Sequence, residues 1–110
     1  MTLVASLDAI VTEEVEFAFH VRNTGSDPVE LTLRSGQTGE LTVTDAETGE
    51  RVWRWSDGRA FTQAIRRESI DPGDTLVFEC TWPDPEPGTF EATATLAADA
   101  SVEVSSRFAV

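Results

Sequence analysis

The chain has 110 residues and a mass of 12.0 kDa, a length that fits one domain and excludes two. Acidic residues number 20 against 8 basic ones, all arginine, and the net charge of −12 excludes the basic stripes that nucleic-acid binding requires. The chain also lacks a run of about 20 apolar residues that could span a bilayer, so we expect no membrane partner.

The absence of lysine beside 20 carboxylates indicates adaptation to a high-salt cytoplasm. At molar salt the Debye length falls to about 3 Å, which mutes the repulsion between carboxylates. At low salt the same repulsion is expected to destabilise the compact state. Residues 1–8 lack the basic start and apolar run of a signal peptide, and the single cysteine excludes an internal disulfide. Both observations favour a cytoplasmic location.

Apolar and polar residues alternate along most of the chain, and this period of two is typical of β-strands. The clearest case is residues 15–21, in which Val15, Phe17, Phe19 and Val21 would share one face. Turn residues separate the alternating runs, with Gly49 in an expected hairpin loop and Pro72–Gly73 at the centre of a turn. The expected strands, in chain order, lie at residues 3–7, 15–21, 29–33, 41–43, 52–55, 76–82, 90–96 and 102–108.

Short strands with turns about every ten residues are typical of an immunoglobulin-like antiparallel β-sandwich. We therefore predict an all-β fold of about 7–9 strands without a substantial helix, as one domain over residues 1–110. A small closed barrel is the competing architecture. Residues 61–70 do not alternate, and their apolar spacing fits either one helical turn or an irregular crossover.

The composition offers little with which to assemble a catalytic site. The only histidine, His20, falls on the polar face of its expected strand, and Cys80 alternates in phase with Phe78 and Trp82 and should point into the core. Nucleophilic catalysis needs a nucleophile, a base and an orienting group close together, and these two side chains do not supply that set. We therefore predict no enzyme and no catalytic residue. They also cannot build a zinc site, and the acidic pairs at 71/74 and 84/86 lack the spacing of a known calcium loop. No metal or cofactor is expected.

Trp53 and Trp55 stand two residues apart, and so on one face of a strand. One interpretation makes both of them core anchors, since each tryptophan can bury about 200 Å². The other gives the loop at residues 56–60 a binding role, because aromatic residues and arginine dominate interface energetics. The predicted core anchors are Phe17, Phe19, Trp53, Trp55, Phe78, Trp82 and Phe90.

The order of several short motifs resembles the intracellular proteinase inhibitor family of the BsuPI type. The resemblance covers about residues 14–97, and Phe90 stands where the family pattern usually has tyrosine. Its most specific parts are Ser35-Gly36-Gln37 and Val52-Trp53-Arg54-Trp55-Ser56. The other matching segments are residues 17–24, 28–31, 49–51, 61–64, 72–74 and 87–90.

This resemblance implies an immunoglobulin-like fold and inhibition of an intracellular protease of the serine, subtilisin-like type. It carries no reactive-site residue over to this chain. Two loops are candidates for contact with the protein partner, at residues 56–60 and at the proline-rich residues 82–88. A non-inhibitory interaction or accessory domain remains the alternative. The candidate partner-binding residues are Arg54, Ser56, Asp57, Gly58, Arg59, Asp84, Pro85 and Glu86.

Overall fold

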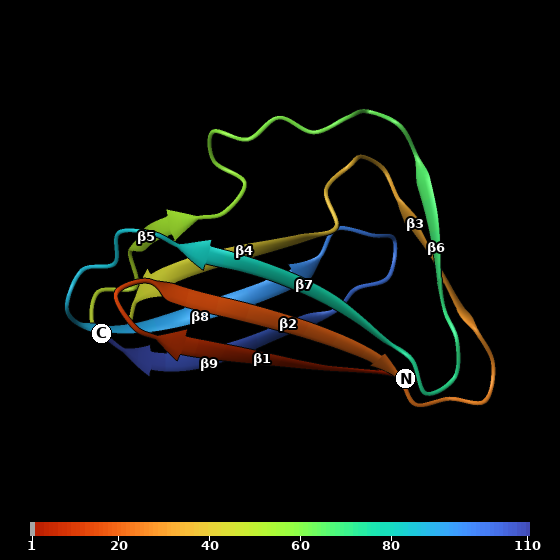
Figure 1. The fold of residues 1–110 in the computed structure, drawn as a ribbon, viewed down its shortest axis with the longest axis horizontal. Helices are drawn as coiled ribbons and strands as arrows, with labels where there is room; N and C mark the ends of the chain where they lie inside the picture. Colours follow the sequence, from red (N-terminus) through yellow and green to blue (C-terminus); the bar gives the residue numbers. More distant parts are fainter. Residues whose placement is uncertain (1) are drawn as a thin grey trace.

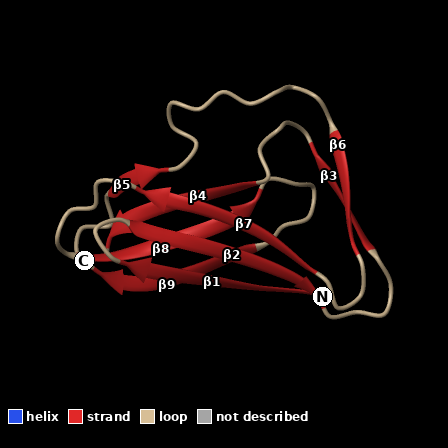
Figure 2. Ribbon diagram, viewed as in Figure 1, coloured by secondary structure: helices blue, strands red, loops and turns tan. Residues whose placement is uncertain are grey.

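The computed structural model describes residues 2–110, which form nine strands and no helix. Figure 2 shows these strands joined by loops alone. The strands are β1 (Leu3–Val11), β2 (Val15–Asn23), β3 (Val29–Leu33), β4 (Gly39–Asp45), β5 (Arg51–Arg54), β6 (Arg66–Ile70), β7 (Thr75–Trp82), β8 (Thr89–Leu96) and β9 (Glu103–Ala109).

Two antiparallel sheets form the body of the molecule. One has the strand order β1-β2-β7 and the other β5-β4-β8-β9. The inward faces of both carry the alternating apolar residues, as in Val15, Phe17, Phe19 and Val21 of β2, which are all buried. The predicted immunoglobulin-like sandwich is therefore confirmed. The barrel alternative is wrong, because no strand pairing within residues 2–110 joins the two sheets.

A separate two-stranded ribbon of β3 and β6 stands across one end of the sandwich (Figure 1). We call it the β3–β6 arm. Leu31 and Ile70 on its inner side are buried in the common core, whereas Glu30 and Arg67 are exposed. The arm is thus fixed to the body by apolar packing and covers the end of the sandwich.

Residues 61–70 agree only in part with the sequence expectations. They contain no helical turn. Residues 61–65 have no regular secondary structure, as the alternative of an irregular crossover implied, but β6 follows from Arg66 to Ile70 and was not predicted. The alternation that should mark β6 is obscured, because Arg66 and Glu68 occupy its half-buried positions and only Ile70 is apolar and buried. The two predicted turns agree with the structure. Gly49 and Gly73 have φ of 75° and 84°, and the Asp74 amide donates to the Asp71 carbonyl at 2.9 Å.

An aromatic cluster fastens the two sheets together. Phe17 of β2 stacks on Trp53 of β5 with ring centroids 6.3 Å apart and meets Phe108 of β9 edge-on at 5.5 Å. Trp82 of β7 also stacks on Trp53, at 6.2 Å, and meets Phe90 of β8 edge-on at 5.2 Å. These contacts each cross from one sheet to the other, so the cluster sets how the sheets pack.

Asn23, the last residue of β2, is a fully buried polar side chain. Its Nδ2 donates to the carbonyls of Asp27 and Ile70, both at 2.8 Å, and its Oδ1 accepts from the Gly25 amide at 2.9 Å. Its backbone bonds to Gly73 and Asp74 in the turn between β6 and β7. One side chain thus joins the β2–β3 loop to the end of the arm.

Candidate functional site

The segment that links β5 to β6 is the longest stretch without secondary structure between two strands. We call residues 55–65 the crossover segment. It arches over one edge of the sandwich toward the arm (Figure 1). Both interpretations of the tryptophan motif depend on how this segment is held.

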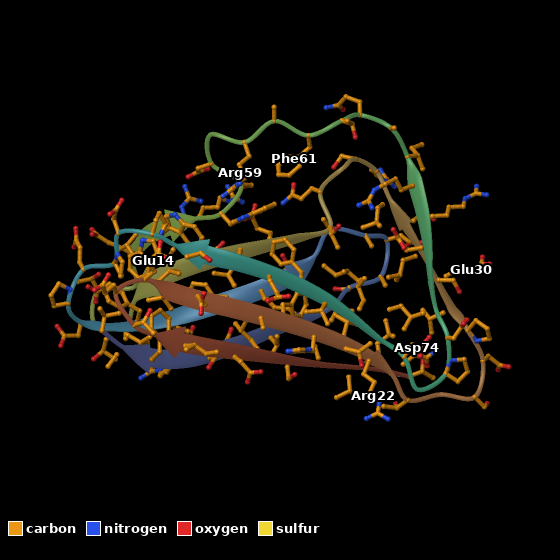
Figure 3. The ribbon with its side chains drawn as sticks, viewed as in Figure 1. Glu14, Arg22, Glu30, Arg59, Phe61 and Asp74 are labelled. Carbon is orange, nitrogen blue, oxygen red and sulfur yellow. The ribbon has the colours of Figure 1, made fainter. Side chains whose placement is uncertain are left out.

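Trp55 lies at the start of the crossover segment and packs inward. Its ring meets Phe78 of β7 edge-on at 4.9 Å and Phe61 at 5.5 Å, and its amide donates to the Leu41 carbonyl at 2.9 Å. Figure 3 places Phe61 on the sandwich side of the arch. Through Phe61 the crossover segment therefore packs again on the Trp55 ring.

Arg59 forms a lid over Trp55. Its guanidinium carbon lies 4.6 Å from the ring centroid, and its Nε donates to the Trp55 carbonyl at 2.8 Å. Asp57 and Gly58 form the exposed tip of this turn, and Gly58 has a φ of 76° that favours glycine. Arg59 is thus occupied within its own turn, which leaves less of it to contact a partner.

The carboxylate of Glu40 in β4 binds groups at the beginning of the turn that contains Asp57 and Gly58. Its Oε1 accepts from the Leu41 amide at 3.0 Å and from the Ser56 amide at 3.2 Å. Its Oε2 lies 3.4 Å from Arg54 Nε and 3.4 Å from Gln37 Nε2. Arg54 Nε is shielded from solvent and makes no aligned hydrogen bond among residues 2–110, so its interaction with Glu40 is an ion pair. Arg54 and Ser56 therefore support the turn.

The far end of the crossover segment is held by the β3–β4 loop. The Gly36 amide donates to the Thr62 carbonyl at 2.9 Å. Arg66 Nε donates to the Ser35 carbonyl at 3.3 Å, and its NH2 group donates to Thr38 Oγ1 at 3.1 Å. The Ser35-Gly36-Gln37 motif thus serves as a bracket for the crossover segment and the arm.

Between these two attachments, Gln63, Ala64 and Ile65 are exposed. We call residues 63–65 the exposed span. Ile65 is 69% exposed, more than any other exposed large hydrophobic residue described. The sequence analysis placed the candidate binding loops at residues 56–60 and 82–88 and did not identify this span. The signal available was the loss of alternation after Phe61 beside an unusual run without acidic residues.

The second candidate loop, residues 82–88, begins at Trp82, the last residue of β7, and lies elsewhere. It joins β7 to β8 at the end of the sandwich that carries the C-terminus (Figure 1). Asp84 and Glu86 are exposed and Pro85 is half-buried, while Gly88 exchanges two backbone hydrogen bonds with Val110 at 3.1 and 2.8 Å. The structure does not bring this loop together with the crossover segment.

The remaining sequence candidates lie in the sheets, except Trp55, which directly follows β5. Phe17, Phe19, Trp82 and Phe90 are buried, whereas Trp53, Trp55 and Phe78 are half-buried and pack against the same core. His20 lies on the outer face of β2 with Nε2 3.6 Å from Asp8 Oδ2. Burial raises the pKa of the Cys80 thiol to about 12, opposed by the charge of Arg59. Cys80 is therefore a neutral core thiol, without the thiolate that reactivity requires.

Among residues 2–110, no group of three or more His, Cys, Asp or Glu side chains could hold a metal ion. The same residues contain no helix long and apolar enough to cross a membrane.

A protein family described as BsuPI, intracellular proteinase inhibitor, matches residues 3–101. The chain belongs to this family. The match includes the crossover segment and the arm. It also extends beyond the region of resemblance expected from the motifs, about residues 14–97, and takes in β1. No curated protein matches the chain.

Solved structures that resemble this BsuPI-family chain share its fold at low sequence identity. The CARDB domain of a Pyrococcus furiosus protein, crystallised with di-metal ions, is 16% identical with a TM-score of 0.51, over 98% of this chain and 91% of that one. A penta-heme cytochrome c552 from Thermochromatium tepidum is 13% identical with a TM-score of 0.59, over 99% of this chain and 40% of that one. Beta-glucosidase 3B from Thermotoga neapolitana is 13% identical with a TM-score of 0.53, over 96% of this chain. This chain spans 15% of that enzyme's length.

Proposed function

We propose that this protein inhibits a serine protease of the subtilisin-like type in the cytoplasm, by binding through exposed loops and without catalysis of its own. The observation that carries the proposal is the family match over residues 3–101. The partner is therefore a protease, and neither a nucleic acid nor a membrane is needed.

The braced crossover segment supports this proposal physically. Binding is tighter when a loop already has its bound conformation, because less conformational entropy is lost on docking. Protease–inhibitor complexes are also formed with little backbone movement. The crossover segment is held at several points along its length, by contacts of Trp55, Phe61, Thr62 and Arg66. Two surfaces carry the candidate partner-binding residues. Arg54 ends β5, and Ser56, Asp57, Gly58 and Arg59 lie at the beginning of the crossover segment, whereas Asp84, Pro85 and Glu86 form a separate candidate surface.

The test is an inhibition assay in multimolar KCl. The purified protein is titrated against a representative set of the host's own serine proteases, with cleavage of a chromogenic peptide as the measurement. We expect nanomolar to micromolar inhibition of at least one subtilisin-like member. Full activity of every protease at saturating inhibitor would remove the proposal.

A non-inhibitory interaction domain is the second candidate. It is favoured by β7, an eight-residue strand at the edge of its sheet with Val77 44% exposed. An edge strand can pair with an extended segment of another protein. Capture of a non-protease partner in high salt, with no protease inhibited, would favour this function.

We also propose that the acidic surface is matched to a high-salt cytoplasm. Twenty carboxylates on 110 residues repel one another at low salt, and screening at multimolar KCl reduces that repulsion. We expect the melting temperature to rise by about 10 °C between 0.1 and 3 M KCl, equivalent to about 2 kcal/mol. A domain of similar size and near-zero net charge, melted in the same solutions, is the control. An equal response in both proteins would contradict the proposal.

A further inference from the structure

The exposed span, residues 63–65, faces solvent between two points at which the chain is held. On one side Phe61 packs on Trp55, with ring centroids 5.5 Å apart, and the Thr62 carbonyl accepts from the Gly36 amide. On the other side Arg66 is held by the Ser35 carbonyl and by Thr38. The span is therefore a short bridge between two fixed points.

The backbone of the exposed span has unused hydrogen-bonding capacity. Within residues 2–110, no backbone hydrogen bond involves the amides or carbonyls of Gln63, Ala64 or Ile65. Regular pairing begins only at Arg66, opposite Leu33 of β3. Backbone amides and carbonyls are strong hydrogen-bonding groups, so these unpaired groups are available to bond with a strand of another protein.

The side chains of this region differ from the rest of the surface. From Gly58 to Arg67 there is no acidic residue and there are three arginines, in a chain with a net charge of −12. An acidic or neutral protein can approach here without the repulsion that the remaining surface imposes. Ile65 is 69% exposed, and its neighbours Gln63 and Ala64 carry no charge. An exposed branched apolar side chain on such a bridge fits an apolar pocket on a partner.

We propose that the exposed span is the segment that enters the substrate cleft of the target protease. Its backbone pairs with the strand that normally receives the substrate, and the Ile65 side chain fills an apolar specificity pocket. Arg67, the exposed arginine that follows the span, meets an acidic group at the rim of that cleft. This inference rests on the proposed function and names the contact residues within it.

The test compares Ile65→Asp with the wild-type protein against the first protease that the wild type inhibits. A carboxylate in an apolar pocket is unfavourable, so the inhibition constant should rise at least 100-fold. The matched control is Ile10→Asp on β1, where the isoleucine is 56% exposed on the outer face of the β1-β2-β7 sheet. This control should keep the inhibition constant within about threefold of wild type, because surface changes away from a contact have small effects. Circular dichroism and melting in 3 M KCl establish that both variants are folded.

Hydrogen exchange on the wild-type complex gives a second measurement that needs no variant. The protease is inactivated at its catalytic serine, and the amides of residues 63–65 should exchange at least tenfold more slowly in the complex than in the free protein. Protection confined to residues 56–60 or 83–88, or unchanged inhibition by folded Ile65→Asp, would overturn the inference while leaving the proposed function intact. Absence of inhibition by the wild type would instead remove the proposed function, and this inference with it.

Discussion

Replacing Phe17 by alanine is expected to lower the free energy of unfolding by about 4 kcal/mol, since truncation of a buried phenylalanine combines lost burial with a cavity. Phe17 is 2% exposed, and its ring touches Trp53 and Phe108 of the opposite sheet. The substitution removes a contact that fastens the two sheets together. Urea unfolding in 3 M KCl, followed by tryptophan fluorescence, measures the loss.

Two further variants test whether the loss in Phe17→Ala comes from the packed ring. Glu16→Ala changes the neighbouring exposed residue on the outer face of β2 and should stay within about 0.5 kcal/mol of wild type. Phe17→Leu keeps much of the apolar volume and should cost about half as much as alanine. If Phe17→Ala were no more destabilising than Glu16→Ala, the ring would not be part of the packed core.

Replacing Asn23 by alanine is expected to cost about 3 kcal/mol. The change leaves the Ile70 carbonyl, whose bond to Asn23 is buried, without a partner, which costs about 1–3 kcal/mol. It also removes the part-buried bonds to the Asp27 carbonyl and the Gly25 amide, which contribute about 0.5 kcal/mol each. The loss should be accompanied by faster hydrogen exchange in the β2–β3 loop and at the end of the arm. Denaturant unfolding and amide exchange give the two measurements.

Asn23→Asp distinguishes a hydrogen-bonding role from simple space filling. The aspartate keeps the acceptor for Gly25 but points a charged oxygen at two carbonyls where Nδ2 donated, so it should be at least as destabilising as alanine near pH 7. Thr24→Ala is the control, because its exposed Oγ1 makes one bond to the Thr2 carbonyl. A mild effect of Asn23→Asp beside a severe effect of Asn23→Ala would contradict this description of the hydrogen bonds.

The sandwich could be predicted because its strands repeat a simple physical pattern. Residues 15–21 and 76–82 place an apolar residue at every second position, and one face of each is indeed turned to the core. The turn at residues 71–74 could also be predicted, since proline and glycine occupy the positions whose backbone angles they favour. Local sequence rules are sufficient where burial and turn geometry agree.

The arm could not be predicted in the same way. Arg66 takes a half-buried position in β6 because carbonyls of the β3–β4 loop and the Thr38 hydroxyl accept its donors. Those acceptors come from residues about 30 positions earlier, so no local pattern reveals them. The motif Ser35-Gly36-Gln37 was recognised as specific, but its role as a bracket appears only when the chain is folded.

Gly36 gives that bracket a further consequence. An added Cβ at Gly36 would lie 2.8 Å from Thr62 Oγ1 and 3.3 Å from the Thr62 amide nitrogen. Any side chain at this position would therefore require Thr62 to move. Rotation of the exposed Thr62 hydroxyl relieves the closest contact, and the Thr62 backbone then has to give by a few tenths of an ångström. Glycine at position 36 thus lets the β3–β4 loop and the crossover segment approach closely enough for the hydrogen bond between the Gly36 amide and the Thr62 carbonyl.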